Sequence, residues 1–454
     1  MARVSKALSD SAEAAERALR EAGLAGCRVV VGLSGGVDSV ALLHALVQVA
    51  PRLHLTLCAL HVHHALSPHA DDWARSCSEQ CRALGVPLTE ARVHVQRNCG
   101  LGVEGAAREA RYAVFRQQQA DAVALAHHAD DQAETLLLQL LRGAGVRGLS
   151  AMPPARVLDP ATGLQLVRPW LRLTRAEIHA YARGAGLTWI EDEANRDSAF
   201  DRSFLRERVM PELRARFPAL AETLGRAARN FADAAQLLEE LAASDARGAA
   251  SGDSLLLSTL AGLTPARARN LLRWFLEQQG LPAPSRDQLE EALRQAIAAR
   301  SDARLRVKLG AAWLRRHRGR LFLEAASREP TRTWSLTWAG EPRVALPAGL
   351  GYLHFEAARG TGLSLARLSA HGVTVRPRCG GERMRLAPNR PSRTLKNLLH
   401  ETHVPQWERA RMPLIFAGDA LVWVPGVGQD FRFAAGLDEP GVMPRWEREG
   451  QAAG

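Results

Sequence analysis

A short turn near the start of the chain holds residues that could bind phosphate. The turn reads Ser34-Gly35-Gly36-Val37-Asp38-Ser39. It follows a β-branched apolar run that ends at Leu33, and a segment of helical composition begins after it. The two glycines can adopt dihedral angles that side chains forbid, so backbone N–H groups can face a ligand closely. A helix that starts there adds unpaired N–H groups and a partial positive charge, which suit phosphate, and the two serines add hydroxyl donors.

Asp38 distinguishes this turn from the common phosphate-binding loop. That loop needs a lysine after its last glycine to meet the terminal phosphates, whereas this turn contains a carboxylate. A carboxylate repels phosphate unless a divalent cation lies between them, so Asp38 is a candidate Mg²⁺ ligand. The alternative is an ordinary strand-to-helix turn in which the helix dipole favours an acidic residue.

Histidines and arginines recur where later elements end or begin. His61, His63 and His64 lie at the end of a predicted strand over 54–62. Neighbours on a strand face opposite sides, so we expect a nucleotide-contacting loop rather than a metal site. Arg108 and Arg111 lie three residues apart on a predicted helix, where they could clamp phosphate or face solvent paired with nearby glutamates.

Acidic residues begin the predicted helix over 130–141. Asp131 and Glu134 can both point toward the strand ends, where two carboxylates could hold an amine or a metal. Ordinary acidic capping of the helix is the alternative. Further along, an acidic run over 191–197 precedes Arg202 and Arg206, which indicates either an internal salt-bridged face or a loop that touches substrate.

The elements that must position these residues alternate between strand and helix. Strands are predicted over 29–33, 54–62, 88–95 and 121–126, with helices between them. This order predicts an α/β fold with a parallel sheet covered by helices on both faces. In such a sheet ligands bind beyond the carboxyl ends of the strands, where the candidate residues lie.

Length and charge limit the class of protein. The chain has 454 residues, which indicates two or three domains, and a formal net charge of +11, which suits a polyanionic partner. Its six cysteines form no C-x-x-C pair, and Cys77 and Cys81 are expected to be buried thiols. No signal peptide or membrane-spanning run is evident, so we expect a cytoplasmic enzyme with no membrane partner. The sequence leaves a homodimer open.

The Ser34–Ser39 string resembles the pyrophosphate-loop (PP-loop) signature of the N-type ATP pyrophosphatases, which adenylate an oxygen of a substrate. Together with the later segments, in their order and spacing, it resembles the tRNA(Ile)-lysidine synthetase family over about the first 215 residues. The other matching segments are His61–Ser67 with Asp71, Ala110–Tyr112, His127–Thr135, Arg168–Leu171 and Glu191–Arg206. Ser203 and Ala194 depart from the family pattern, and both lie in the last of these segments.

The resemblance implies a reaction and a set of residue roles. ATP, with Mg²⁺, would adenylate the C2 carbonyl oxygen of the wobble cytidine in tRNA(Ile) with a CAU anticodon, and free L-lysine would then displace AMP. Asp38 would hold Mg²⁺, Arg111 would assist adenylation, and Asp131 and Glu134 would bind lysine. The predicted ATP contacts are Ser34, Gly35, Gly36, Val37, Asp38, Ser39, His61 and His64, and the predicted tRNA contacts are Arg202, Arg206, Arg383, Arg393 and Lys396.

The rest of the chain changes in pattern. We predict a catalytic PP-loop domain over 1–215, a mainly helical tRNA-binding middle domain over 216–330, a linker over 331–362 and a small α+β tRNA-binding domain over 363–454. Arg267, Arg269 and Arg315 in the middle domain are further candidate tRNA-backbone contacts. A basic surface that reflects only the arginine-rich composition is the alternative for these residues.

Three other functions compete with this one. A cytidine thiolase of the same superfamily would need paired cysteines, and a glutamine-dependent amidating synthetase would need a glutaminase domain with a nucleophilic cysteine. The sequence contains neither feature. A non-catalytic tRNA-binding protein built on this fold would not need Asp38, Arg111, Asp131 and Glu134 together.

Overall fold

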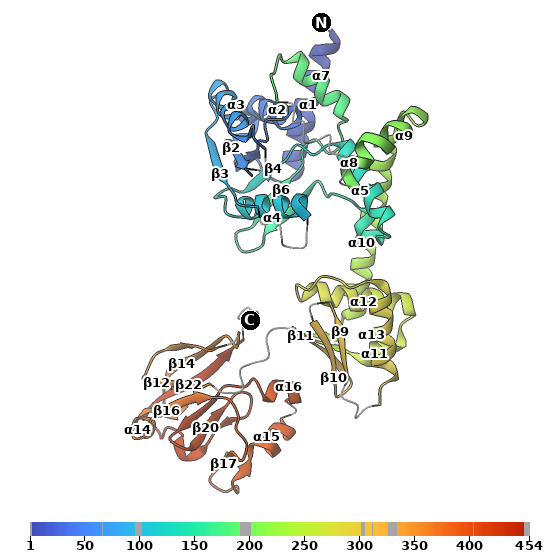
Figure 1. The fold of residues 1–454 in the computed structure, drawn as a ribbon. Helices are drawn as coiled ribbons and strands as arrows, with labels where there is room; N and C mark the ends of the chain where they lie inside the picture. The colour runs from blue at the N-terminus through green and yellow to red at the C-terminus, as the bar shows by residue number, and fades with distance from the viewer. Residues whose placement is uncertain are drawn as a thin grey trace. The chain divides into compact units, whose positions relative to one another are not determined.

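The computed structural model describes residues 2–65, 67–95, 102–190, 201–300, 305–310, 312–325, 334–347, 349–402 and 404–448. The chain forms two compact units, Met1–Leu241 and Ala242–Gly454, whose elements Figure 1 labels in chain order. The predicted boundaries at 215, 330 and 362 remain a prediction. In the described residues, no helix is both long enough and apolar enough to cross a membrane.

A six-stranded sheet forms the centre of the first unit. Its strands are β1 (Arg28–Gly32), β2 (Thr56–His63), β3 (Leu88–Arg92), β4 (Ala122–Ala124), β5 (Ala155–Asp159) and β6 (Leu164–Val167), in the order β3-β2-β1-β4-β6-β5. All neighbours pair in parallel except β5, which runs antiparallel to β6 at the edge. The predicted parallel sheet is confirmed, and the β5–β6 hairpin is an addition that the sequence did not predict.

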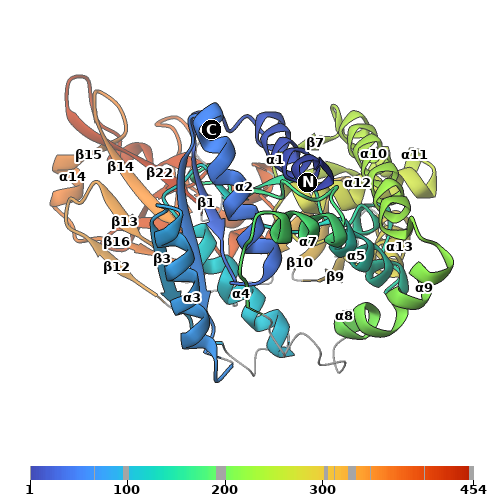
Figure 2. The same cartoon turned by 90° about the horizontal axis from the view of Figure 1, so that it is seen from above.

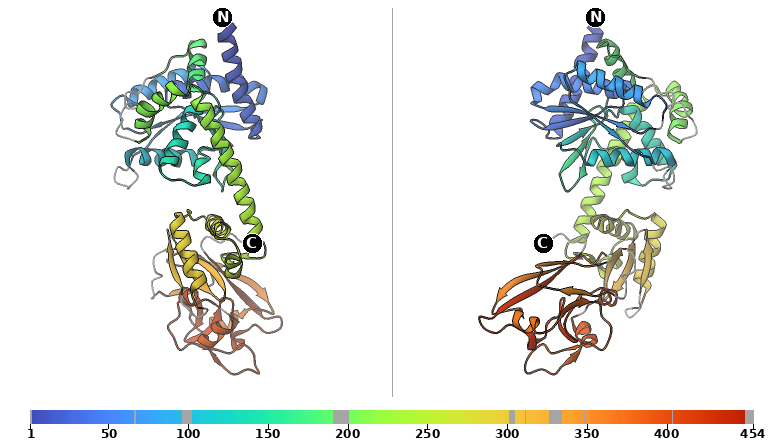
Figure 3. Two further views of the ribbon diagram at one scale, coloured as in Figure 1. Left: turned by 90° about the vertical axis from the view of Figure 1, so that its right-hand side faces the viewer. Right: turned by 60° about the vertical axis from the view of Figure 1, so that its left-hand side comes forward.

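Helices bury both faces of this sheet (Figure 3). Val29 and Val31 face one core, shared with α1 (Ala2–Glu21), α2 (Val37–Leu53), α3 (Ala70–Ala83) and α7 (Arg175–Gly184). Val30 faces the opposite core, where Tyr112 and Phe115 of α4 (Gly102–Arg116) pack on β4, β5 and β6. This alternation explains why the strand is apolar throughout, since both of its faces are buried. Helices α1, α2 and α7 lie side by side (Figure 2).

The strand order reverses direction at β1, between β2 and β4. In parallel sheets such a switch point opens a crevice beyond the carboxyl ends of the strands. The turn after β1 and the start of α5 (Ala129–Leu141), which follows β4, therefore converge there. The remaining helices of this unit are α6 (Val146–Leu149), α8 (Asp201–Phe204), a π-helical turn η2 (Leu205–Val209), α9 (Met210–Arg216) and α10 (Leu220–Ala246), which continues into the second unit.

The second unit begins with helices packed on a sheet. Helices α11 (Leu257–Gly262), α12 (Pro265–Gln278) and α13 (Arg286–Ala298) share a core with an antiparallel sheet. Its strands, in the order β7-β8-β11-β10-β9, are β7 (Ala250–Ser251), β8 (Ser254–Leu256), β9 (Arg306–Leu309), β10 (Ala312–His317) and β11 (Arg320–Ala325). The predicted helices are present, and this sheet is a finding of the structure.

The end of the chain is rich in strands, as expected for a small α+β region. One sheet has the order β12-β16-β19-β20-β21, a second has the order β13-β14-β22-β15, and β17 pairs with β18. The strands are β12 (Leu336–Trp338), β13 (Arg343–Ala345), β14 (Tyr352–Arg359), β15 (Leu363–Ser364), β16 (Val373–Arg376), β17 (Arg383–Met384), β18 (Arg393–Thr394), β19 (Leu414–Ala417), β20 (Ala420–Val424), β21 (Gly428–Gln429) and β22 (Pro440–Glu447). The short helices are α14 (Leu365–Ser369), α15 (Leu395–Glu401), α16 (Gln406–Arg409) and η3 (Phe431–Phe433).

Candidate active site

The turn between β1 and α2 has the geometry of a phosphate cradle. Gly35 has φ = +88°, and a Cβ atom there would lie 2.8 Å from Ile190 Cδ1 and 3.3 Å from Cys77 Sγ. Its carbonyl accepts a 3.0 Å hydrogen bond from the Ile190 N–H. Gly36 is the N-cap of α2 and makes no side-chain cap. A side chain at position 35 would thus be both strained and crowded, which explains the glycine.

The amides of this turn are open. In the part of the chain that the structure describes, the N–H groups of Gly35, Gly36, Val37 and Asp38 donate no hydrogen bond. The two serines hold the turn in place, since Ser39 Oγ donates to the Gly36 carbonyl over 2.9 Å and accepts from the Ser34 N–H over 3.2 Å. The serine hydroxyls also lie 3.1 Å apart. The turn therefore presents consecutive unpaired donors on a rigid backbone, as an anion site requires.

Asp38 presents a carboxylate oxygen to this cradle without a protein partner. Its Oδ1 is buried and accepts no hydrogen bond from the described residues, while Oδ2 lies 3.8 Å from His128 Nε2. Burial raises the pKa of Asp38, and the charge of Asp131 adds to that rise. A buried oxygen that lacks a donor fits a hard cation, which Mg²⁺ binding would supply.

The predicted histidines line the strand end next to this turn. His61 Nδ1 lies 2.9 Å from the carbonyl oxygen of Leu33, so the ring supports the backbone that enters the cradle. Burial lowers the pKa of His61. Burial and the charge of Arg111 lower the pKa of His64 to about 4, so this ring is neutral at neutral pH.

His128 links the cradle to the acidic helix start, and the sequence did not single it out as a site residue. It is the N-cap of α5, where Asp131 Oδ2 accepts from the His128 N–H over 3.1 Å and His128 Nδ1 accepts from the Asp131 N–H over 3.4 Å. The other ring nitrogen of His128, Nε2, faces two aspartates. This atom lies 3.5 Å from Asp131 Oδ2 and 3.8 Å from Asp38 Oδ2.

Asp131 and Glu134 form a buried carboxylate pair, and two guanidinium groups form salt bridges with it. Arg206 Nε and Nη2 each lie 2.8 Å from a Glu134 oxygen, and Arg202 contacts Glu134 over 3.1 Å and Asp131 over 3.0 Å. The side chain of Glu134 is 3% exposed. Burial would raise the pKa of Asp131, but His128 and Arg202 hold it below its usual range. The observed partners of both arginines are thus carboxylates, and their role in tRNA binding stays a prediction.

The sequence also did not predict Asp130 and His179 as site residues. Asp130 is buried, and its Oδ2 accepts a 2.7 Å hydrogen bond from the Arg175 N–H at the start of α7, while its Oδ1 pairs with Arg214. His179 of α7 has its pKa lowered by burial and by Arg175, and the charge of Asp38 acts on it in the opposite direction. Thr174 and Glu177 form a capping box at the start of this helix.

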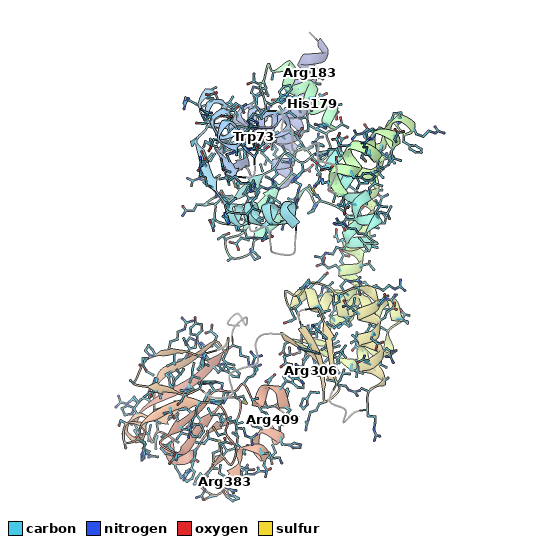
Figure 4. The ribbon with its side chains drawn as sticks, in the orientation of Figure 1. Trp73, His179, Arg183, Arg306, Arg383 and Arg409 are labelled. Atoms are coloured by element: carbon cyan, nitrogen blue, oxygen red, sulfur yellow. The ribbon has the colours of Figure 1, made fainter. Side chains whose placement is uncertain are left out.

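The predicted tRNA contacts near the end of the chain lie on exposed parts of the second unit. Arg383 belongs to β17 (Figure 4) and donates to the Ser392 carbonyl over 2.7 Å. Arg393 pairs with Glu401 over 2.6 Å, and Lys396 is exposed on α15. In the middle region, the candidate arginines are each paired with an acid: Arg267 with Asp245, Arg269 with Glu290, and Arg315 with Glu324.

The remaining parts of the sequence prediction are placed as follows. Cys77 and Cys81 are buried, as expected, and burial raises their pKa values to about 12 and about 11. Ser203 lies in α8. The acidic run over 191–197, with Ala194, lies outside the described residues.

Known proteins match the chain over nearly its whole length. Residues 9–213 match a family described as the PP-loop domain, residues 255–322 match the TilS substrate binding domain, and residues 373–448 match the TilS substrate C-terminal domain. A tRNA(Ile)-lysidine synthase of Nitrosomonas europaea is 42% identical, covering 93% of this chain and 92% of that protein. One from Azoarcus is 42% identical over 92% and 91% of the two chains. On these matches and the geometry of the site, the chain belongs to the tRNA(Ile)-lysidine synthase family.

Proposed function

We propose that the chain is an ATP-dependent ligase that joins the ε-amine of free L-lysine to C2 of the wobble cytidine in tRNA(Ile) with a CAU anticodon. One observation carries this proposal: His128 Nε2 lies between Asp38, beside open backbone amides, and Asp131 of a buried carboxylate pair. His128 would thus contact both the site that activates the nucleotide, at Asp38, and the site that binds the cationic amine, at Asp131. The relatives carry the name of a lysidine synthase, in agreement with this chemistry.

The first half of the reaction uses the cradle. The amides of Gly35, Gly36, Val37 and Asp38 would hold the phosphates of ATP while the C2 carbonyl oxygen of cytidine attacks the α-phosphorus and the bond to pyrophosphate breaks. Asp38 would hold Mg²⁺, which neutralises charge on the leaving pyrophosphate. Arg111 would stabilise negative charge on the α-phosphate.

The second half uses the carboxylate pair. The lysine amine would bind Asp131 and Glu134 in place of a guanidinium group, because the two carboxylates are already fully paired with Arg202 and Arg206. The displaced guanidinium groups then become available to an anion such as a tRNA phosphate. After the amine loses a proton, its nitrogen attacks C2, and the bond between C2 and the AMP oxygen breaks. Asp131, Glu134 and His128 are the groups placed to accept that proton.

A thiolase would need an accessible thiolate, and the described residues place none near the cradle. Cys77 lies beside Gly35, but its thiol is buried and its pKa is raised to about 12. A neutral buried thiol is a poor nucleophile, so amine ligation is favoured over sulfur transfer.

The test is incubation of the full-length chain with ATP, labelled lysine and tRNA(Ile) with a CAU anticodon, followed by nucleoside analysis. We expect label on the modified cytidine, with AMP and pyrophosphate released. A reaction without lysine should release about one pyrophosphate per tRNA under single-turnover conditions and then stop. The matched control is tRNA(Met), which has the same anticodon. ATP consumption without any labelled nucleoside would contradict the proposal.

A further inference from the structure

Three arginines gather around one tyrosine hydroxyl beside the active site. Arg108 Nη2 donates to the Tyr112 hydroxyl over 3.2 Å, and its guanidinium carbon lies 5.0 Å from the ring centroid. The guanidinium carbon of Arg156 lies 5.6 Å from the same centroid, and the charges of Arg108, Arg168 and Arg156 lower the pKa of the Tyr112 hydroxyl. These side chains come from three elements, namely α4, β5 and the segment after β6.

No described carboxylate pairs with the arginines of this cluster. Among the residues that the structure describes, none of the three guanidinium groups forms an ion pair with Asp or Glu, whereas Arg116 on the same helix pairs with Glu109 over 3.1 Å. Arg168 is only 3% exposed and is fixed by the Pro153 carbonyl over 2.7 Å. The three guanidinium groups repel one another, so a bound anion would stabilise the arrangement.

The cluster borders the site described above. Arg168 Nε donates to His127 Nδ1 over 3.2 Å, and His127 directly precedes His128. Burial lowers the pKa of His127, as do the charges of Arg168, Arg202 and Arg108, whereas the charge of Asp131 raises it. In the sheet, β4 separates β6, which precedes Arg168, from β1, which leads into the phosphate cradle.

We propose that Arg108, Arg156 and Arg168, held around Tyr112, form a phosphate site that binds a backbone phosphate of the tRNA next to the nucleotide being modified. The proposal rests on the proposed function. The cradle already offers open amides to the ATP phosphates, so a second anion site two strands away suits the other polyanion in the reaction. Arg108 and Arg156 are exposed and can reach a strand from solvent, while the buried Arg168 and Tyr112 position them.

The test compares Arg108→Gln/Arg156→Gln with the wild type in two measurements. The first is the affinity for tRNA(Ile) as a function of salt, and the second is the KM for ATP. We expect the dissociation constant for tRNA to rise about tenfold or more. The slope of log affinity against log salt should become less negative by about 0.7, since one phosphate contact to single-stranded RNA is lost. The KM for ATP should not change.

Controls keep folding and function separate from the proposal. Arg116→Gln removes a paired arginine from the same helix and should leave both quantities unchanged. Tyr112→Phe keeps the ring but removes the hydroxyl, so it should lower tRNA affinity by less than the double variant and preserve the melting temperature. An unchanged salt slope in the double variant overturns the proposal, as does a raised KM for ATP with unaltered tRNA affinity, which would assign the cluster to ATP. If the wild type forms no lysidine yet its tRNA affinity depends on these arginines, the proposed function fails and the phosphate site stands.

Discussion

Glu134→Gln tests the carboxylate pair most directly. In the wild type, Glu134 accepts from Arg202 over 3.1 Å and twice from Arg206 over 2.8 Å, and its side chain is 3% exposed. Glutamine keeps the shape and one acceptor oxygen but loses the charge. A charge-assisted hydrogen bond contributes about 1.5–3 kcal/mol, which corresponds to about a 10- to 150-fold change in a binding constant.

Two effects of this substitution oppose each other. The variant attracts the lysine amine less strongly, but it also holds the competing guanidinium groups of Arg202 and Arg206 less strongly. Because lysine must displace one of these groups, part of the loss is cancelled. We therefore expect the low end of the range, a rise of about tenfold in the lysine concentration at half-maximal rate. The same substitution should lower stability by about 1–3 kcal/mol, or a few degrees in Tm.

The assay separates the two halves of the reaction. Lysidine formation is measured against lysine concentration, and pyrophosphate release is measured without lysine, where we expect the wild-type value. Asp201→Asn is the matched control, since Asp201 is an exposed acid of α8 that pairs with Arg142 over 2.8 Å. An unchanged lysine dependence in Glu134→Gln, or an equal change in Asp201→Asn, would refute the reasoning.

The other predictions concern the cradle and the distant basic residues. Asp38→Ala should abolish pyrophosphate release and leave tRNA affinity within about twofold, as filter binding would show; normal release would remove the Mg²⁺ role. Burial raises the pKa of Asp38, so the folded state binds its proton more tightly than the unfolded state does. Asp38→Asn should therefore raise Tm at neutral pH, and this gain should shrink as pH falls through the raised pKa; a constant gain would contradict it. Gly35→Ala should lower ATP affinity at least about tenfold, because position 35 has φ = +88° and lies 2.8 Å from Ile190; unaltered affinity would argue against the cradle. Arg383→Gln/Arg393→Gln should weaken tRNA binding and flatten its salt dependence by about 1–2 in slope, with unaltered pyrophosphate release from saturating tRNA.

Much of the fold of the first unit could be predicted from the sequence. The apolar run before Ser34 becomes β1, and Asp131 lies in the first turn of α5, where it takes part in a capping box. These features depend on a few consecutive residues, whose periodicity and capping chemistry are local. The alternation of strands and helices was enough to predict the parallel sheet, since a crossover helix is the usual connection between parallel strands.

Other features of the fold could not be predicted in this way. The edge strand β5 and the sheet of β7 to β11 consist of short strands of mixed polarity. Such strands have little local signal, because pairing with distant partners stabilises them.

The sequence by itself determined which residues could bind phosphate, a cation or an amine, because that chemistry belongs to the residue types and their spacing. Only the tertiary structure decided which of them meet. It placed His128 between Asp38 and Asp131, set Arg202 and Arg206 on the carboxylates, and brought Arg108 and Arg156 to the ring of Tyr112. The physical reason is that each contact joins residues on different elements, and the distance between them depends on how the sheet and its helices pack.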